Sequence, residues 1–310
     1  MSEALSATTT LSPDETLTQA LALRSTRVRS GRFRITSPRA TMAKLSAYGV
    51  LALVAIFFIT PLLWLVLASL EPHAAVGANA PLVLSFSNFA KVLNWQTTFL
   101  PLINSAILSG GTAVLTVVVA LFAAYPLSRY QMRFRKPFLY IIVFSTGLPI
   151  TAILVPVYTM FARFDLVDNV PAVILFMTAT SLPFGIWLMK GFMDGVPLDL
   201  EQAAWVDGAT WVGSLRRIVA PLMMPGITVI LIFTFAAQWG NFYVPFILLQ
   251  SNNKLPASVS IYQFFSNQGG IYYGELAAFS ILYTLPAVGL WIVVGRFLRG
   301  KFSFAGAVKG

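Results

Sequence analysis

Side chains that could act as nucleophiles, general bases or metal ligands are scarce in this chain of 310 residues. There is no cysteine, which excludes disulfides, cysteine-ligated zinc and thiol catalysis, and His73 is the single histidine. Asp165 and Asp168 form a close acidic pair beside Arg163, and we interpret them as turn residues. A Gly-x4-Gly-Lys-Ser/Thr loop is missing, so the chain should not bind ATP in the P-loop manner. We therefore expect no catalytic site and no metal site.

The most informative spacing of polar residues lies in the loop from Gly191 to Ala220. Asp199 precedes Gln202 by three residues, which fits a capping box and predicts that a short helix begins there. Gly208 can adopt the left-handed backbone conformation that ends a helix. A second helical stretch is expected over 210–219. The pattern predicts a helix, a glycine elbow and a second helix lying along a membrane surface.

Small side chains on the first of these helices indicate what the element could do. Ala203 and Ala204 keep its exposed face slim, so that a groove on a partner protein could receive it closely. Asp207 lies one turn after Ala203 and could fix the elbow by hydrogen bonding. The sequence thus favours docking over catalysis for this loop. A connecting loop with helix propensity and no partner is the alternative interpretation.

Six long segments without a charged residue must position this loop. The chain is 57% hydrophobic and 10% charged, whereas soluble domains carry roughly 25% charged residues. A hydrocarbon core about 30 Å thick needs roughly 20 helical residues, and every segment is long enough. The sequence therefore predicts an all-α integral membrane protein with six transmembrane helices. The segments are 45–70, 92–128, 137–162, 169–189, 218–253 and 276–295.

Two of the segments are longer than a single span. We interpret 92–128 and 218–253 as one helix plus an uncharged loop each, with breaks at Pro101 and over 250–253. Prolines inside the predicted spans are expected to kink their helices, and these are Pro149, Pro156, Pro183 and Pro245.

The distribution of basic residues predicts the orientation of the chain. Of 21 Lys and Arg residues, all but Lys91, Arg163 and Lys254 lie in the N-terminal segment, the loops after spans two and four, or the C-terminal tail. Positively charged segments stay in the cytoplasm, so both termini are expected there and the protein in the cell membrane. The net charge of +10 then faces anionic lipid headgroups, and no nucleic acid partner is needed.

The N-terminal and membrane regions form two expected domains. Residues 1–44 are polar, basic and weakly patterned, and they predict a mostly disordered cytoplasmic extension. Residues 45–310 are expected to form the transmembrane domain, with the loop 191–220 on its cytoplasmic side.

The loop 191–220 resembles the coupling loop of permeases in ATP-binding-cassette (ABC) importers. The family pattern is Glu-Ala-Ala, three residues, Gly, nine residues, Ile, one residue and Leu-Pro. The spacing is the same here, and the aligned residues are Gln202, Ala203, Ala204, Gly208, Ile218, Ala220 and Pro221. Gln202 replaces the usual Glu and Ala220 replaces the usual Leu. Glu201, next to Gln202, is expected to supply the carboxylate.

The similarity covers roughly residues 45–310 and is closest to carbohydrate-uptake permeases of the maltose-transporter second-subunit type. The family usually has Trp-Asn-Glu-Phe in the fifth span, where this chain has Trp239-Gly240-Asn241-Phe242 and so lacks the acidic group. The other similar segments are Asn104-Ser105, 123–129, Ser181-Leu182-Pro183-Phe184, Pro245 and the tail 305–310.

The resemblance implies a type I ABC importer permease that moves a sugar or sugar derivative into the cytoplasm by alternating access. It implies a heterodimer with a second, similar permease, an ABC ATPase dimer that binds ATP and Mg²⁺, and an external solute-binding protein. The chain itself would be non-catalytic and would bind no cofactor. The implied ATPase-coupling residues are Glu201, Gln202, Ala203, Ala204, Asp207, Gly208, Ile218 and Pro221.

Amides beside aromatic rings suit a pathway for uncharged, hydroxyl-rich solutes. Such residues concentrate in the fifth span, with an amide and a hydroxyl near the second, and we interpret them as lining the pathway. They are Gln238, Trp239, Asn241, Phe242, Tyr243, Asn104 and Ser105. Packing of the aromatic residues against the partner permease, or an interfacial aromatic belt, is the alternative. The sequence does not identify the solute.

Other classes of membrane protein predict features that this chain lacks. An ATP-independent secondary sugar carrier usually keeps an ionisable group near the midplane, but no Asp, Glu, Lys, Arg or His lies inside the six segments. Glu275 lies only at the edge of the last. A membrane-embedded enzyme would show acidic or histidine clusters at the interface. A purely structural subunit would not require the glycine elbow.

Overall fold

The computed structural model describes residues 38–72, 74, 84–265 and 270–302, and every regular element in these ranges is helical. The elements are α2 (Pro38–Leu70), α3 (Ser87–Val92), the π-helix η2 (Trp95–Phe99), α4 (Leu100–Arg129), α5 (Arg135–Ser145), α6 (Ile150–Arg163), α7 (Val170–Asp194), α8 (Leu198–Val206), α9 (Trp211–Ser214), the π-helix η3 (Leu215–Val219), α10 (Ala220–Leu222), α11 (Met224–Trp239), α12 (Tyr243–Leu248), the 3-10 helix η4 (Asn252–Lys254), α13 (Ala257–Ser260), the 3-10 helix η5 (Ile261–Phe264) and α14 (Tyr273–Phe302).

The chain divides into two compact units, Met1–Thr60 and Pro61–Gly310. Helix α2 crosses the boundary between them and begins at Pro38, within the predicted N-terminal extension. The rest of that extension, the histidine at position 73 and the tail 305–310 lie outside the described residues.

Six membrane spans are present when each of two bent helix pairs is taken as one span. Four spans are single helices, Lys44–Leu70, Trp95–Arg129, Val170–Asp194 and Tyr273–Val293. The bent pairs are Arg135–Ser145 with Ile150–Arg163, and Trp211–Leu222 with Met224–Trp239. Each of the six predicted segments coincides with one of these, so the prediction of an all-α membrane protein is confirmed.

The third predicted span is broken more sharply than expected. The segment 137–162 bends by 94° between α5 and α6, where Pro149 precedes the first residue of α6 with an extended backbone (ψ 124°). Proline has no N–H to donate, and it disfavours helical geometry at the preceding residue. The bend therefore replaces the kink that was expected at Pro149.

The helical breaks predicted for the two longest segments are misplaced. Pro101 interrupts nothing, because η2 continues directly into α4 and Trp95–Arg129 runs through Pro101 as one helix. The fifth span ends at Trp239, well before the predicted break at 250–253. Gly240 caps α11, and the chain restarts as α12 at Tyr243.

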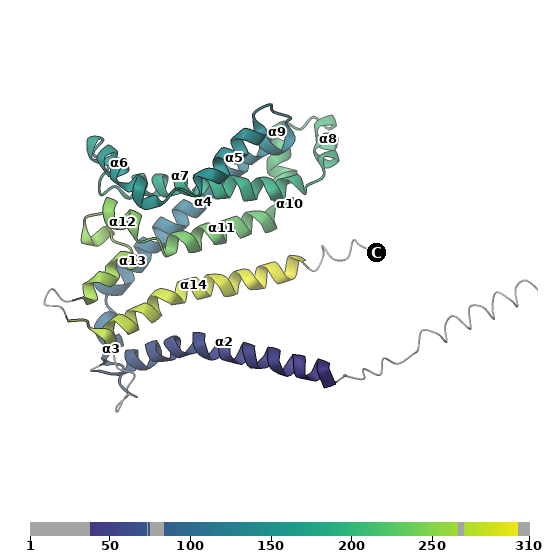
Figure 1. Ribbon diagram of the computed structural model, residues 1–310. Helices are drawn as coiled ribbons and strands as arrows, with labels where there is room; N and C mark the ends of the chain where they lie inside the picture. Colours follow the sequence, from purple (N-terminus) through teal and green to yellow (C-terminus); the bar gives the residue numbers. More distant parts are fainter. Residues whose placement is uncertain (1–37, 73, 75–83, 266–269, 303–310) are drawn as a thin grey trace, which may run out of the picture. The chain divides into compact units, whose positions relative to one another are not determined.

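The core of the Pro61–Gly310 unit forms where α4, α7 and α11 pack side by side (Figure 1). Gly185 of α7 lies so close to α4 that a Cβ there would meet the Thr116 methyl group, which shows how small residues let these backbones approach. One apolar cluster joins the three helices towards the α8–α10 end, with Ala120, Met189 and Ile230 fully buried.

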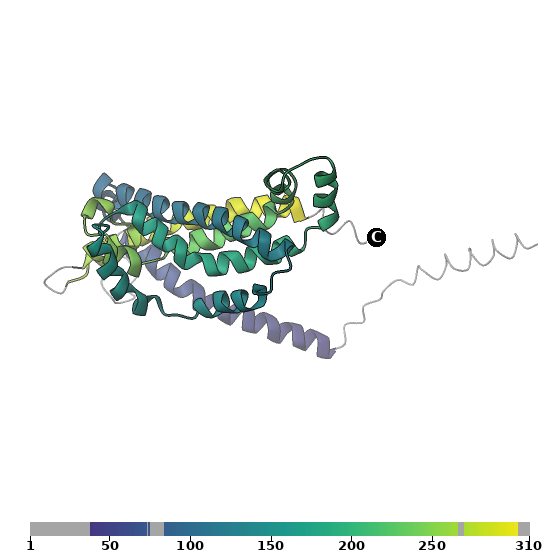
Figure 2. The same ribbon diagram turned by 90° about the horizontal axis from the view of Figure 1, so that it is seen from above.

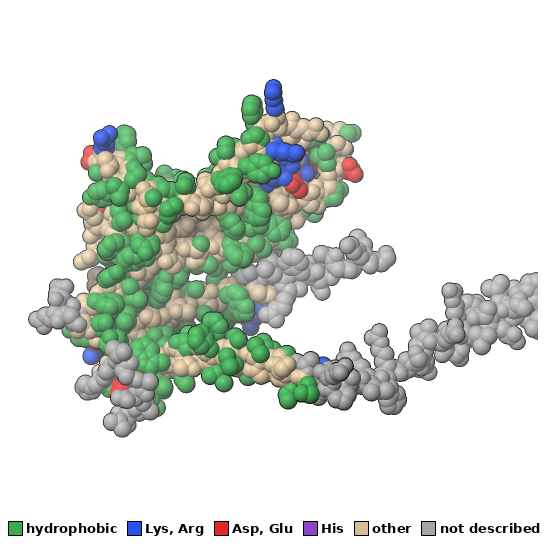
Figure 3. Space-filling view, in the orientation of Figure 1, with side chains coloured by type: hydrophobic (Ala, Val, Ile, Leu, Met, Phe, Trp, Pro, Cys, Tyr) green, Lys and Arg blue, Asp and Glu red, His purple; other side chains and the backbone are tan. Residues whose placement is uncertain are grey.

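A second apolar cluster joins α4, α6, α7 and α12 through Leu108, Leu154, Met177 and Val244. Figures 1 and 2 place α6, α12 and α13 at one end of the Pro61–Gly310 unit and α8 and α9 at the other. On the face shown in Figure 3, charged atoms of this unit gather at its ends and apolar side chains cover much of the region between. This is the surface expected of a protein surrounded by lipid.

Candidate functional site

Helix α8 is the short helix predicted between the fourth and fifth spans. Its N-cap is Pro197, which makes no side-chain cap hydrogen bond, so the predicted capping box at Asp199 and Gln202 is wrong. Asp199 is already the second residue of the helix, because the extended backbone of Pro197 (ψ 131°) sets the start. Asp199 and Glu201 both lie in the first turn, where negative charge is favourable for the helix dipole.

The left-handed elbow predicted at Gly208 is confirmed by its φ of +84°. The N–H of Gly208 donates to the carbonyl of Trp205 (3.0 Å), and the N–H of Ala209 donates to the carbonyl of Ala204 (2.9 Å). These two bonds form a Schellman motif, which closes the C-terminus of α8. The N–H of Asp207 donates to the carbonyl of Ala203 (3.1 Å), but its carboxylate makes no hydrogen bond within the described part of the chain.

The second helical stretch predicted over 210–219 is confirmed as α9 followed by η3. The hydroxyl of Thr210 caps α9 by accepting the N–H of Gly213 (3.2 Å). Leu215 and Val219 are buried in the apolar cluster of α4, α7 and α11. The helical stretch of α9 and η3 is thus part of the core. Ile218 in η3 is half-buried, and Pro221 in α10 is exposed.

Glu201 is turned into the protein and not towards a partner. Its side chain is fully buried, and Oε1 lies 2.5 Å from Nε of Arg129, whose own side chain is 6% exposed. The hydroxyl of Tyr125 donates to Oε2 of Glu201 at 3.0 Å. The expectation that Glu201 supplies the exposed carboxylate missing at Gln202 is therefore wrong. A buried carboxylate is stable only when paired and hydrogen-bonded, and α4 provides both partners.

Further contacts hold the start of α8 against the C-terminal end of α4. A guanidinium nitrogen of Arg129 donates to the carbonyl of Val196 (3.1 Å). The hydroxyl of Ser128 donates to Asp194 (2.6 Å), and Asp194 also pairs with Lys190 and Arg135. The last turn of α7, the start of α8 and the end of α4 therefore form one hydrogen-bonded junction.

The opposite face of α8 is open. Gln202 and Ala203 are exposed, and Val206 is 89% exposed, which is unusual for an apolar side chain. Gln202 and Ala203 each lie about one turn before Val206, so the three residues share a face of the helix. Helix α8 lies at the end of the unit (Figure 1), and the side chains on its open face form a small ridge, with the exposed Asp199 one turn before Gln202 and Ala203.

Trp239, which the sequence placed along a solute pathway, is packed inside the protein. Its indole stacks on Phe235 and Tyr283, with ring centroids 5.4 and 5.7 Å apart, and is 5% exposed. The indole N–H donates to the carbonyl of Tyr283 (3.2 Å), and the Tyr283 hydroxyl donates to the carbonyl of Trp239 (2.7 Å). Trp239 therefore joins α11 to α14.

The amides near the end of α11 brace the break before α12. Gln238 donates to the hydroxyl of Ser181 (2.9 Å) and accepts from the side chain of Asn241 (2.8 Å). The carbonyl of Asn241 accepts the hydroxyl of Ser258 (2.9 Å). Tyr243 is exposed, and it is the one member of the predicted fifth-span set whose side chain is more than half open.

Asn104 and Ser105 hold the backbone of the segment that follows α12. The amide of Asn104 donates to the carbonyls of Asn253 (2.9 Å) and Leu255 (3.1 Å). The buried hydroxyl of Ser105 accepts the N–H of Ala257 (2.9 Å). Both residues therefore support a loop wall, and Ser105 is too buried to touch a solute.

Asp168 fixes the same segment from the other side. Its carboxylate accepts the N–H groups of Gln250 and Ser251 (3.0 Å each), the Ser251 hydroxyl (2.6 Å) and the Lys254 ammonium (2.7 Å). The hydrogen bonds from Lys254 and Ser251 hold the pKa of Asp168 well below its ordinary value. Asp165 and Asp168 both have positive φ, so they are turn residues as predicted, but the bracing role of Asp168 was missed.

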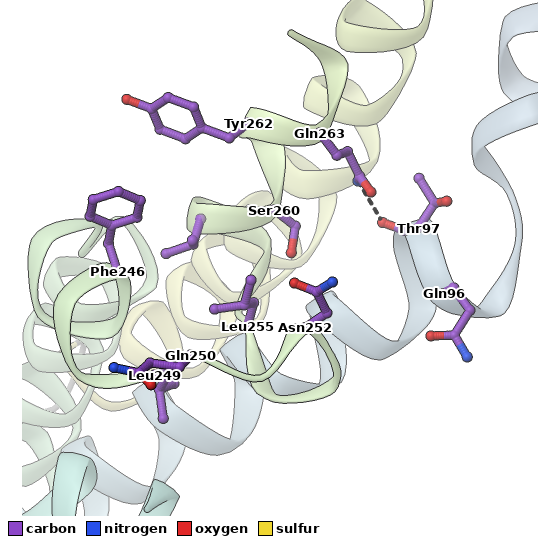
Figure 4. Close-up of a pocket in the computed structure, with 11 residues that line it drawn as sticks. Gln96, Thr97, Phe246, Leu249, Gln250, Asn252, Leu255, Ser260, Tyr262 and Gln263 are labelled. Carbon is purple, nitrogen blue, oxygen red and sulfur yellow. Dashed lines mark hydrogen bonds between the residues drawn. The ribbon is translucent and has the colours of Figure 1, made fainter. Parts of the chain in front are cut away.

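The braced segment forms one wall of a pocket of about 700 Å³ (Figure 4). Phe246 and Tyr262 lie on one side, with ring centroids 5.9 Å apart, and Gln96, Thr97 and Gln263 lie across from them. Phe242 contacts both rings, stacked on Phe246 at 4.8 Å and tilted against Tyr262 at 5.3 Å. The full lining is Gln96, Thr97, Phe246, Leu249, Gln250, Asn252, Leu255, Val259, Ser260, Tyr262 and Gln263.

The sequence reasoning missed this pocket, and none of the seven predicted pathway residues lines it. A signal was present in the sequence, because amides and aromatic residues recur between positions 246 and 263. Among the described residues no cluster of His, Asp or Glu suitable for a metal ion is found.

This helical fold is that of an ABC importer permease. The chain is similar to a chain in the crystal structure of a bacterial ABC transporter involved in the import of the acidic polysaccharide alginate. The TM-score is 0.74 at 19% identity, and the match covers 84% of this chain and 98% of that one.

The family follows from the sequence comparison. Residues 116–299 match the family of binding-protein-dependent transport system inner membrane components, and the chain belongs to this family. It is 28% identical to the trehalose transport system permease protein SugB of Mycobacterium tuberculosis, over 82% of this chain and 93% of that protein. It is 29% identical to the sulfoquinovosyl glycerol transport system permease protein SmoH of Agrobacterium fabrum, over 76% of this chain and 79% of that protein.

Proposed function

We propose that this chain is the permease subunit of an ABC importer that moves a sugar or sugar derivative into the cytoplasm. The observation that carries the proposal is α8, a helix anchored on its inner face by Glu201 and open along the ridge of Gln202, Ala203 and Val206. A helix that is fixed on one face and presents small, exposed side chains on the other suits insertion into a groove of a partner.

The partner of α8 is an ATPase subunit in this proposal. ATP and Mg²⁺ bind to a dimer of such subunits, and closure of the dimer moves α8. Because Glu201 pairs with Arg129, displacement of α8 is transmitted directly to the end of α4. The second helical stretch, α9 and η3, carries the same movement into the core through Leu215 and Val219. The spans then alternate between inward-open and outward-open arrangements. The coupling contact includes Asp207 and Gly208, which shape the elbow.

The rest of the complex follows from the family and from its relatives. A binding protein outside the cell delivers the solute, as the family description indicates. A second, similar permease completes the pathway. The similar trehalose and sulfoquinovosyl glycerol permeases support a solute that contains a sugar. The chain contributes no catalytic group, and ATP hydrolysis belongs to the partner subunits.

The proposed orientation places α8 in the cytoplasm together with both termini. Arg133, Lys136, Arg216 and Arg217 are exposed near the α8 end, whereas Lys91, Arg163 and Lys254 belong to the opposite end. The excess of positive charge at the α8 end supports this orientation. Nothing in the described spans favours an ATP-independent carrier, because Asp, Glu, Lys, Arg and His occur there only near helix ends.

The proposal is tested by isolating the complex and measuring transport. The chain is affinity-purified from native membranes in mild detergent, and co-purifying proteins are identified by mass spectrometry. The complex is then placed in liposomes with its binding protein and a radiolabelled sugar. Uptake that requires ATP is the expected result. A chain that purifies alone and transports sugar without ATP would overturn the proposal in favour of a secondary carrier.

A further inference from the structure

The pocket between η2, α12 and η5 has the properties of a site for an uncharged, hydroxyl-rich molecule. Its volume of about 700 Å³ lies within the range of about 300–1,000 Å³ that is usual for ligand sites. The described residues that line it carry no charge. Exposed rings of Phe246 (51%) and Tyr262 (56%) provide flat apolar faces on one side.

Hydrogen-bonding groups face these rings across the pocket. Gln263 makes one long bond of 3.4 Å to the carbonyl of Thr97, and Gln250 makes another of 3.4 Å to the Tyr158 hydroxyl. Within the described part of the chain, the side-chain amides of Gln96 and Asn252 make no hydrogen bond. Amide groups can both donate to and accept from hydroxyl groups, so their bonding capacity is available to a ligand.

The wall that carries Gln250 and Asn252 is held in place before any ligand arrives. Asp168 binds the backbone and side chains of this wall from the α6–α7 loop, and Asn104 binds its carbonyls from α4. Fixing a wall in advance reduces the entropy lost on binding, which favours affinity. An unused surface loop would not require two separate braces.

We infer that this pocket binds a neutral saccharide, with sugar rings stacked on Phe246 and Tyr262 and hydroxyl groups bonded to Gln96, Asn252 and Gln263. The inference rests on the proposed function, under which the pocket lies on the extracytoplasmic side. It assigns a saccharide site to this subunit at its outer end. Asp168 and Asn104 act as positioning residues for the site.

The absence of cysteine allows a direct test with single introduced thiols. Asn252→Cys places a thiol in the pocket, and Asn253→Cys is the matched control, because Asn253 is also exposed but does not line the pocket. The complex, in lipid nanodiscs without its binding protein, is labelled with a membrane-impermeant maleimide. The probes are trehalose, maltose and cellobiose, with glucuronate as the charged control.

At least one neutral probe should slow labelling of the N252C variant about tenfold when present at about ten times its dissociation constant. The labelling rate of the N253C variant should not change with any probe, and glucuronate should not change the labelling rate of the N252C variant. Tyr262→Ala in the N252C background should raise the concentration for half-protection about tenfold, whereas Tyr262→Phe should preserve it. Equal protection of both thiols, or no protection by any of the three probes, would overturn the pocket assignment.

Uptake of the same three sugars by the wild-type complex separates this inference from the proposed function. A complex that imports one of them without protecting the N252C thiol contradicts the pocket alone. A complex that imports none of them with ATP, while the thiol is protected, contradicts the proposed importer and leaves the pocket standing.

Discussion

Glu201 and Arg129 form a buried ion pair that joins α8 to the C-terminal end of α4. The 2.5 Å contact between Oε1 and Nε is made by side chains that are 0% and 6% exposed, and the Tyr125 hydroxyl donates to the other carboxylate oxygen. An ion pair in such a place gives little net stability over apolar residues, but removal of one partner is costly. Its value for this protein is the fixed position of α8.

The first prediction is a double-mutant cycle at this pair. Glu201→Ala should destabilise the unit by about 3–5 kcal/mol, because the Arg129 guanidinium would remain buried without a counter-charge. The double variant Arg129→Met, Glu201→Leu should recover much of that loss. Thermal unfolding of the purified complex measures both effects.

The neighbouring residue provides the control for this cycle. Gln202 is exposed, so Gln202→Glu should leave stability unchanged and preserve uptake. Additive losses in the cycle, or a Gln202→Glu variant as unstable as Glu201→Ala, would contradict the buried pair.

The second prediction concerns the elbow at Gly208. Gly208→Pro should abolish ATP-dependent uptake while the protein still inserts, because proline cannot adopt a φ of +84° and removes the N–H bonded to Trp205. Gly208→Ala should cost about 1–2 kcal/mol, since a Cβ there meets open space but the left-handed conformation is strained.

Gly191→Ala is the matched control, because this glycine is helical and also faces open space. Uptake is measured in liposomes, with membrane insertion checked by protease protection. Wild-type uptake by Gly208→Pro would rule out a role for the elbow in coupling.

The third prediction separates packing from solute contact at the end of α11. Trp239→Ala should lower stability by about 3–5 kcal/mol, because it empties the space between Phe235 and Tyr283. Tyr243→Ala should have little effect on stability, since Tyr243 is 53% exposed. Thermal unfolding of the two variants provides the comparison. A Trp239→Ala complex with normal stability and altered solute selectivity would restore Trp239 to the pathway.

The fourth prediction is a pH dependence that arises from Asp168. Its pKa is lowered in the folded protein by bonds from Lys254 and Ser251, so the contribution of Asp168 to stability is complete above about pH 5. The contribution should decline as the pH falls below about 3.9, the ordinary pKa of an aspartate. The Asp168→Asn variant should lack this component, and its unfolding temperature should fall less between pH 5 and pH 3 than that of the wild type. Parallel pH profiles would contradict the prediction.

Local sequence patterns predicted much of the fold. Charge-free runs revealed all six spans because lipid excludes ionised side chains over a fixed length. The elbow at Gly208 was predictable because glycine is the residue that takes a left-handed conformation without strain. The second helical stretch, 210–219, was predicted because it directly follows that elbow.

Contacts between distant segments were not predictable from local patterns. Tyr125 and Glu201 are 76 residues apart, and Lys254 is 86 residues from Asp168. Nothing near Glu201 in the sequence indicates that its carboxylate turns inward and that Gln202 turns outward. The packing of Trp239 was missed for the same reason, because the break at Gly240 and the stacking of Trp239 on Tyr283 depend on how α11 meets α14.

The most direct test of the central claim asks whether α8 contacts the ATPase. Ala203→Cys in this cysteine-free chain is modified with a maleimide–benzophenone reagent and irradiated in the assembled complex. Ala162→Cys, an exposed alanine near the end of α6, serves as the control. Coupling through α8 predicts a cross-link between the A203C variant and the ATPase subunit and none from the A162C variant. A complex that imports solute with ATP but gives no such cross-link from A203C would contradict the account.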